Sequence, residues 1–406
     1  MAEVTRRKLF AVTGAVGAAG AGGLAAAAIL PRESSTGSIT ATDDQELAFY
    51  GAHQPGISAP VQAQGWLTAF DLKPGTTIAE VWALMREWTS IAATAMAGRT
   101  LTSDDAMAHG RGPGALTVTV GVGASLLTKL GLGHQIPEAL SPLPTFLGDA
   151  IDAAASDGDL VLLVAANDGL VAVHALRAMQ RSAAAATTQR WQINGFGEAG
   201  GVMPSPTATP RNLMGQLDGT GNPKPGTTAF DQTVYIPANG DPAWMRGGSY
   251  MVYRRIRMLL NEWDTLDRGQ QEAVIGRDKI TGAPLSGGTE FTAPDYEKFG
   301  SSGSLLIPPG SHIRQASAQF NSGATIYRRP FSYYSGLRAD GSPDAGLMFL
   351  AFQQNPATGF TIIQQRLSGA DTLSTVIRHE ASGLFAMLPG CAEGGYLGQA
   401  LLEGSA

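Results

Sequence analysis

The sequence predicts an α+β protein made of two related halves, each with an antiparallel sheet and peripheral helices. The first half shows strand and helix patterns in the order β-α-β-β-α-β, and the second half repeats this order more loosely. This order is that of a ferredoxin-like sandwich. Hydrophobic residues make up 44% of the 406 residues and charged residues 15%, which is typical of a chain that buries a large core.

In the first half, β-branched or apolar alternation predicts strands, and apolar residues at helical spacing predict helices. The helix over 77–97 rests on the stripe of Ala79, Val81, Trp82, Leu84 and Met85. A second helix is predicted over 170–185. The predicted strands are 63–72, 115–122, 160–165 and 190–195.

The same patterns predict the second half. Strands are expected over 248–258, 324–333, 347–354 and 384–388, and helices over 259–267, 270–277 and 360–368. Glycine- and proline-rich stretches over 199–247 and 281–311 indicate functional loops, because structureless loops of this length are uncommon in compact proteins. We therefore expect halves at 47–200 and 201–400, which together resemble a dimeric α+β barrel.

The N-terminus predicts an export signal over 1–30. The motif Thr5-Arg6-Arg7-Lys8-Leu9-Phe10 precedes a weakly hydrophobic run of small residues, which resembles a twin-arginine signal. An ordinary secretory signal or a membrane anchor is the alternative. Residues 31–46 are small and polar, as in a linker. We expect an exported protein, secreted or held in the periplasm or cell envelope.

Charge and cysteine content exclude several function classes. The net charge is −6 and no basic run follows the N-terminus, which argues against a nucleic-acid partner. Cys391 is the single cysteine, so neither an intramolecular disulfide nor a CxxCH haem attachment can form.

The candidate chemical residues are ambiguous when each is taken alone. None of the six histidines lies four residues from another, which disfavours a multi-histidine metal site. His312 alone is most simply a structural histidine, although one imidazole is enough to ligate haem iron. Asp218 alone is most simply a turn residue. Arg328 and Arg329 end an apolar strand, where they need an anion or a structural salt bridge.

Together these segments resemble the dye-decolourising haem peroxidases. The ordered set covers about 47–392 and comprises Phe49 to Ile57 (FYGAHQPGI), Thr209 to Met214 (TPRNLM), Gly215 to Pro223 (GQLDGTGNP), Ser311 to Arg314 (SHIR), Arg328-Arg329 and Phe385 to Gly390 (FAMLPG). With the export signal, the chain resembles the exported branch of that family.

The resemblance implies two ferredoxin-like halves and one non-covalent haem b in the second half. It implies that His312 is the proximal iron ligand and that Asp218 and Arg328 act on the distal face, with Arg329 as the alternative arginine. Gly219, Thr220, Gly221 and Arg328 would contact the cofactor. An acid orienting His312 is expected, with Asp371 first and Glu380 second. The family arginine after Ser-His-Ile-Arg is missing here.

The implied activity is reduction of hydrogen peroxide and one-electron oxidation of bulky, dye-like organic donors. Asp218 would transfer the proton, and Arg328 would stabilise negative charge during O–O cleavage. Iron release from haem, as in deferrochelatases, and a non-catalytic haem carrier are the alternatives. A hydrolase built on Asp218 is disfavoured, because no nucleophile elbow is present. The twin-arginine machinery is an expected partner, and a homo-oligomer is left open.

Overall fold

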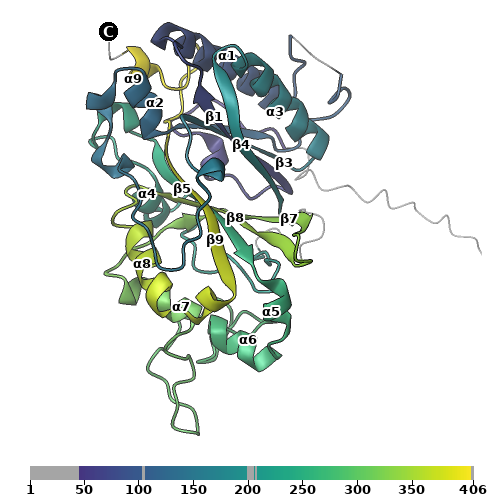
Figure 1. Ribbon diagram of the computed structural model, residues 1–406, viewed down its shortest axis with the longest axis vertical. Coiled ribbons are helices and arrows are strands. Elements are labelled where there is room, and N and C mark those ends of the chain that lie inside the picture. The colour runs from purple at the N-terminus through teal and green to yellow at the C-terminus, as the bar shows by residue number, and fades with distance from the viewer. Residues whose placement is uncertain (1–44, 103–105, 199–204, 206–207, 404–406) are drawn as a thin grey trace, which may run out of the picture. The chain divides into compact units, whose positions relative to one another are not determined.

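A computed structural model describes residues 45–102, 106–198, 205 and 208–403. Its strands form a single sheet in the order β5-β9-β2-β3-β1-β4-β7-β8-β6. An additional pairing joins β5 to β8 and closes the sheet into a barrel (Figure 1). The predicted signal and linker lie outside the described residues. The predicted division at residue 200 also falls there and stays a prediction.

The first half has the ferredoxin-like strand order β2-β3-β1-β4. Strands β2 and β3 are buried along their whole length, as their continuous apolar sequences predict. The strands are β1 (Gln64–Leu72), β2 (Thr117–Val122), β3 (Leu160–Ala166) and β4 (Thr187–Phe196).

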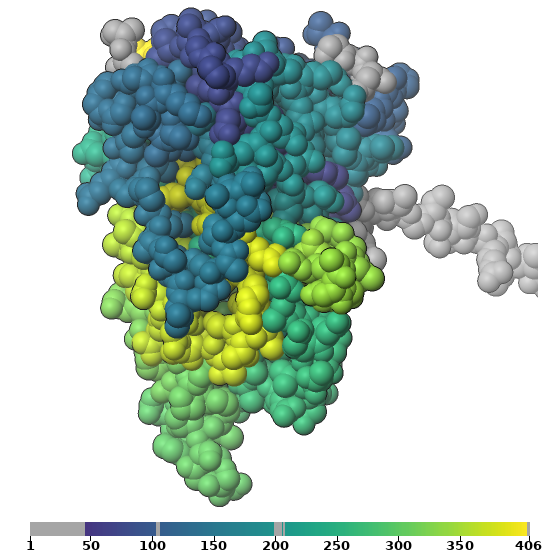
Figure 2. Space-filling model, in the orientation of Figure 1, coloured from purple at the N-terminus to yellow at the C-terminus, as the bar shows by residue number. Residues whose placement is uncertain are grey.

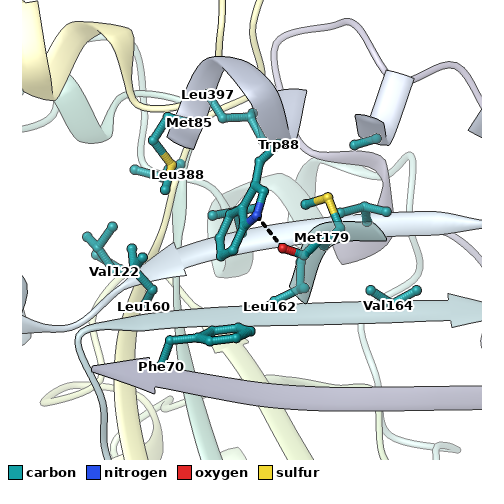
Figure 3. Packing of buried hydrophobic residues seen from close by; sticks show 14 of the residues in the cluster. Phe70, Met85, Trp88, Val122, Leu160, Leu162, Val164, Met179, Leu388 and Leu397 are labelled. Carbon is teal, nitrogen blue, oxygen red and sulfur yellow. Dashed lines mark hydrogen bonds between the residues drawn. The ribbon is translucent and has the colours of Figure 1, made fainter. Parts of the chain in front are cut away.

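Two long helices cover the outer face of this half, and both begin at side-chain caps. Thr77 and Glu80 form a capping box at the start of α1 (Ile78–Met96). Asp168 caps α3 (Gly169–Ala183) by accepting from two backbone N–H groups. The indole of Trp88 packs over the sheet and donates to the carbonyl of Met179, which ties the two helices together (Figure 3).

The second half repeats the order as β9-β5-β8-β7. Its strands are β5 (Ser249–Met258), β6 (Tyr327–Arg328), β7 (Phe331–Leu337), β8 (Pro343–Gln353) and β9 (Ile377–Met387). The remaining helices are α2 (Ala124–Lys129), α4 (Thr228–Val234), α5 (Leu260–Asp264), α6 (Arg268–Ile275), α7 (His312–Gln315), α8 (Phe360–Ala370) and α9 (Gln399–Glu403). The α+β class and the two ferredoxin-like halves are confirmed.

Three predicted strands of the second half differ from the observed ones, and for the strand over 347–354 the difference is that β8 begins earlier, at Pro343. The strand over 324–333 is divided into β6 and β7 because Pro330 has no N–H to donate to the ladder. The strand over 384–388 begins earlier, at Ile377. Its first part carries Arg378, His379 and Glu380, and these polar residues hide the strand pattern.

The two halves contact each other along more than the barrel strands. Pairings of β2 with β9 and of β4 with β7 join the sheets. The backbone N–H groups of Ala150 and Asp152 also donate to the carbonyls of His379 and Glu380 on β9. In Figure 2 the blue segment that precedes β3 covers part of the yellow C-terminal region. First-half residues therefore pack against β9 of the second half.

Among the described residues, no helix combines the length and apolar character needed to span a membrane.

Candidate active site

The second half contains a cavity of about 410 Å³. Its walls come from β5, β8, β9, α8 and the loop around Asp218, and they are mainly apolar, with Ile256, Leu347 and Phe349 among them. A few polar groups face the same space. A mostly apolar cavity of this size with few polar groups is typical of a cofactor or ligand site. His312, Asp218, Arg328, Gly219, Thr220, Gly221 and Asp371 all line it.

His312 is the first residue of α7, and its ring is held by a buried carboxylate. The Nδ1 atom lies 2.6 Å from Oδ2 of Asp371. Asp371 is itself fixed between α8 and the following turn, where Oδ1 accepts from the N–H of Leu373. With Nδ1 engaged, Nε2 is the ring nitrogen left for a metal ion. The structure thus places Asp371, the first of the two predicted acids, beside His312.

Electrostatics around His312 favour a polarised ring. Burial alone would lower the pKa of His312, but the charge of Asp371 and its hydrogen bond outweigh burial. The net result is a pKa above the usual value. A carboxylate on the far nitrogen raises the basicity of a ligating imidazole.

Asp218 and Arg328 form an ion pair inside the cavity. Nη1 of Arg328 donates to Oδ1 of Asp218 at 2.6 Å, and Nδ2 of Asn212 donates to Oδ2 at 3.3 Å. The Asp218 side chain is 12% exposed and the Arg328 side chain 26%. Both are therefore accessible from the cavity and shielded from bulk solvent. The cavity thus holds a carboxylate, which can accept a proton, next to a guanidinium, which is positively charged and donates hydrogen bonds.

Asn222 fixes Arg328, a role that sequence reasoning missed. Its Nδ2 donates to the carbonyl of Arg328 at 2.6 Å, and its Oδ1 accepts from the N–H of Arg328 at 3.1 Å. This two-bond clamp ties β6 to the loop that carries Asp218. The quoted motif contained Asn222, but only the fold brings it to Arg328, 106 residues away.

The two glycines beside Asp218 differ in what the backbone requires. Gly219 has φ +140°, which side-chain-bearing residues rarely adopt. A Cβ at Gly221 would meet nothing within 4 Å. The backbone conformation therefore favours glycine at Gly219, whereas the surrounding protein atoms do not require it at Gly221.

Arg329 and Glu380 lie away from His312 and Asp218. Arg329 is fully buried, and its guanidinium donates to the carbonyls of Ala59 and Pro60 and to Gln62. The structure therefore places Arg328, not Arg329, in the cavity. Glu380 pairs with Arg255 at 2.8 Å and with Arg257 at 2.6 Å, and it does not contact His312.

Known proteins share this fold over nearly the whole chain. The family model described as Dyp-type peroxidase, N-terminal, matches residues 54–197, and the one described as Dyp-type peroxidase, C-terminal, matches residues 209–392. A dye-decolorizing peroxidase from Thermobifida fusca (strain YX) is 41% identical, covering 98% of this chain and 97% of its own. The solved structure of ferric DtpA from Streptomyces lividans is 51% identical, with a TM-score of 0.87, covering 90% of this chain and 99% of its own. A deferrochelatase from Yersinia pseudotuberculosis serotype I (strain IP32953) is 34% identical, covering 88% and 85%.

The matches over both ferredoxin-like halves place the protein in a class of oxidoreductases that act on hydrogen peroxide. The chain belongs to the Dyp-type peroxidase family. The resemblance found in the sequence motifs is confirmed.

Proposed function

We propose that this chain is a haem b peroxidase that oxidises bulky, dye-like organic donors by one-electron steps. The observation that carries the proposal is the meeting of His312, Asp218 and Arg328 in one apolar cavity. Three segments far apart in the sequence supply these residues. If each of the three residues had only a structural role, they would not need to face one cavity.

The residues present fit a non-covalent haem. The apolar walls suit a flat porphyrin, and Nε2 of His312 is available for one axial bond to iron. Cys391 does not line the cavity, so covalent attachment has no thiol. When bound, the haem supplies an iron atom that exchanges electrons with peroxide and with the donor.

Asp218 is suited to move the proton of the peroxide. Its carboxylate can take a proton from one peroxide oxygen and deliver it to the other, which leaves as water. Arg328 holds the carboxylate at 2.6 Å and presents a cation where negative charge develops during O–O cleavage. Asn222 keeps the backbone of Arg328 in register with Asp218. Asp371 orients His312.

Rapid mixing with peroxide tests the proposal. The purified protein should show a Soret band that shifts on addition of peroxide. Asp218→Asn should slow that shift by about 10²-fold or more, because general acid–base catalysis contributes roughly 10²–10⁴-fold. Asp264→Asn, an exposed carboxylate on α5, is the matched control. A colourless protein that takes up no haem, or a parent rate in Asp218→Asn, would contradict the proposal.

A second candidate function is release of iron from haem with the porphyrin intact, which the 34% identical deferrochelatase favours. Free protoporphyrin has a strong red fluorescence that haem lacks. Incubation of the protein with haem and a reductant, followed by fluorescence, distinguishes this reaction from peroxide turnover.

We also propose export through the twin-arginine machinery, supported by the motif around Arg6 and Arg7. Replacement of both arginines by lysine should retain the protein in the cytoplasm, and blocking the general secretory route should not.

A further inference from the structure

A second histidine, His379, faces the same cavity and has no part in the proposed chemistry. It lies on β9, where the ladder with β5 is irregular. Arg255 pairs with Ala381 and the next residue, Ile256, pairs with His379, so Glu380 is an extra, bulged residue. A bulge re-aims the neighbouring side chain. His379 thereby shares the face of Ile256, which also lines the cavity.

A buried ion pair fixes the protonation of the His379 ring. Nε of Arg254 donates to Nδ1 of His379 at 3.3 Å, and the same guanidinium pairs with Asp149 of the first half. The side chains of Arg254 and Asp149 are only 1% and 4% exposed. Because Nδ1 accepts, the proton of the neutral ring is on Nε2. Burial, followed by the charge of Arg254, lowers the pKa of His379 to about 3, so the ring stays neutral at ordinary pH.

Nε2 of His379 meets a second donor, the side-chain amide of Gln364 on α8. The two nitrogens lie 3.5 Å apart, and both residues line the cavity. Among the described residues, neither nitrogen has an oxygen acceptor. Two N–H groups cannot satisfy each other. If the amide is turned over, its oxygen accepts from Nε2, but its NH₂ group then needs a partner.

We propose that His379 and Gln364 form a carboxylate-binding subsite in the cavity. In the orientation that the structure gives, the amide NH₂ and the Nε2–H are both donors, and the pair holds no acceptor for them. In the turned orientation one donor, the amide NH₂, is left over. A carboxylate supplies two oxygens that can receive converging N–H donors. Arg254 strengthens the Nε2–H donor, because its own hydrogen bond polarises the imidazole.

Two sources could provide the carboxylate. One is an acidic side chain of the bound porphyrin, and this source rests on the proposed haem function. The other is a free organic acid that enters beside the porphyrin. The chemistry is the same, so the experiment has to separate the sources.

Porphyrin binding provides a test that does not depend on turnover. The haem-free protein is titrated with ferric protoporphyrin IX and with its dimethyl ester, which has no free carboxylate, and tryptophan fluorescence reports binding. The variants are Gln364→Leu and His379→Leu. Among the described residues the guanidinium of Arg254 bonds to His379, Ser382 and Asp149 and not to Gln364, so Gln364→Leu removes a donor and leaves the ion pair in place. The exposed His134→Leu is the matched control.

We expect each variant to lose about tenfold or more in affinity for the free acid, because a hydrogen bond to a charged group contributes about that much. Affinity for the dimethyl ester and binding by the control should stay at the parent level. A variant that weakens both porphyrins equally would overturn the proposal, because its effect would then be structural. A variant that changes neither would overturn the porphyrin source.

A second titration tests the free-acid source. Benzoate is added to the haem-loaded parent and to Gln364→Leu. If the variants bind the free acid and the dimethyl ester as the parent does, a Soret shift with benzoate in the parent but not in Gln364→Leu supports a carboxylate subsite for a free acid. No shift in either protein, together with unchanged porphyrin preference, overturns the proposal. If the parent binds neither porphyrin, the proposed haem function fails, which is a distinct result.

Discussion

Removal of the Asp149 carboxylate should destabilise the protein more than loss of any surface charge. Asp149→Asn leaves the guanidinium of Arg254 buried, 1% exposed, with no anion. Breaking a buried ion pair in this way costs roughly 3–5 kcal/mol. Unfolding about 350 ordered residues releases an entropy of roughly 0.73 kcal/mol per kelvin, at ~2.1 cal/mol/K per residue. A loss of ~4 kcal/mol should therefore lower Tm by about 5 °C.

Differential scanning calorimetry of the haem-free protein measures this change. The matched control is Glu297→Gln, whose carboxylate is 75% exposed and pairs with Arg314 at 3.5 Å. An exposed pair of this kind contributes ~0–1 kcal/mol, so the control should melt within about 1 °C of the parent. The double variant Asp149→Leu with Arg254→Met should recover much of the loss, since no charge is then left unpaired. Equal melting of Asp149→Asn and the parent would refute the reasoning.

Three further predictions concern the cavity. Asn222→Ala removes both hydrogen bonds that hold the backbone of Arg328. At ~1 kcal/mol for each bond, we expect the reaction with peroxide to slow about 30-fold. An unchanged rate in stopped-flow mixing would show that Arg328 does not depend on these bonds. Asp371→Asn weakens the polarisation of His312, so the reduction potential of the bound iron should rise by tens of millivolts, since ~1.4 kcal/mol corresponds to ~59 mV for one electron. Spectroelectrochemistry measures this potential, and an equal or lower value in the variant would contradict the prediction. The pKa of His379 is lowered to about 3 from 6.5. Between these values the unfolded chain binds a proton that the folded chain does not, so the free energy of unfolding should fall as the pH drops below about 6.5, by roughly 2 kcal/mol at pH 5. In urea titrations His379→Gln should lose less stability over this range, and an identical pH slope would contradict the assignment.

Sequence patterns predicted the fold best where burial is uniform. The runs that became β2 and β3 are apolar on both faces and were placed to within two residues. The start of β9 was missed because Arg378, His379 and Glu380 do not alternate between apolar and polar residues. These polar residues are there because the strand borders a cavity on one side and an ion cluster on the other. The polar side chains at the start of β9 thus hide the alternation by which a strand is predicted from sequence.

The candidate site could be predicted in part. Motifs indicated His312, Asp218 and Arg328, and the structure brings all three to one cavity. The choice between Asp371 and Glu380 depended on distance, because both are acids that follow α8 in the sequence. Only Asp371 reaches His312, and Glu380 is turned toward Arg255 and Arg257. No local signal connects Asp149 with Arg254, which are 105 residues apart.

Contacts from the first half support residues around the cavity of the second half, which explains why both ferredoxin-like units are needed in one barrel. A single unit would leave the edges of its sheet unpaired, and closing the barrel removes those edges. Closure also brings first-half groups to the second half: Gln62 meets the fully buried Arg329 next to Arg328, and Asp149 meets Arg254 behind His379. The first half thus anchors Arg329, which is next to Arg328 in the chain, and Arg254, which contacts His379. Substitutions at Gln62 or Asp149 should therefore alter the spectrum of the bound haem, although neither residue lines the cavity.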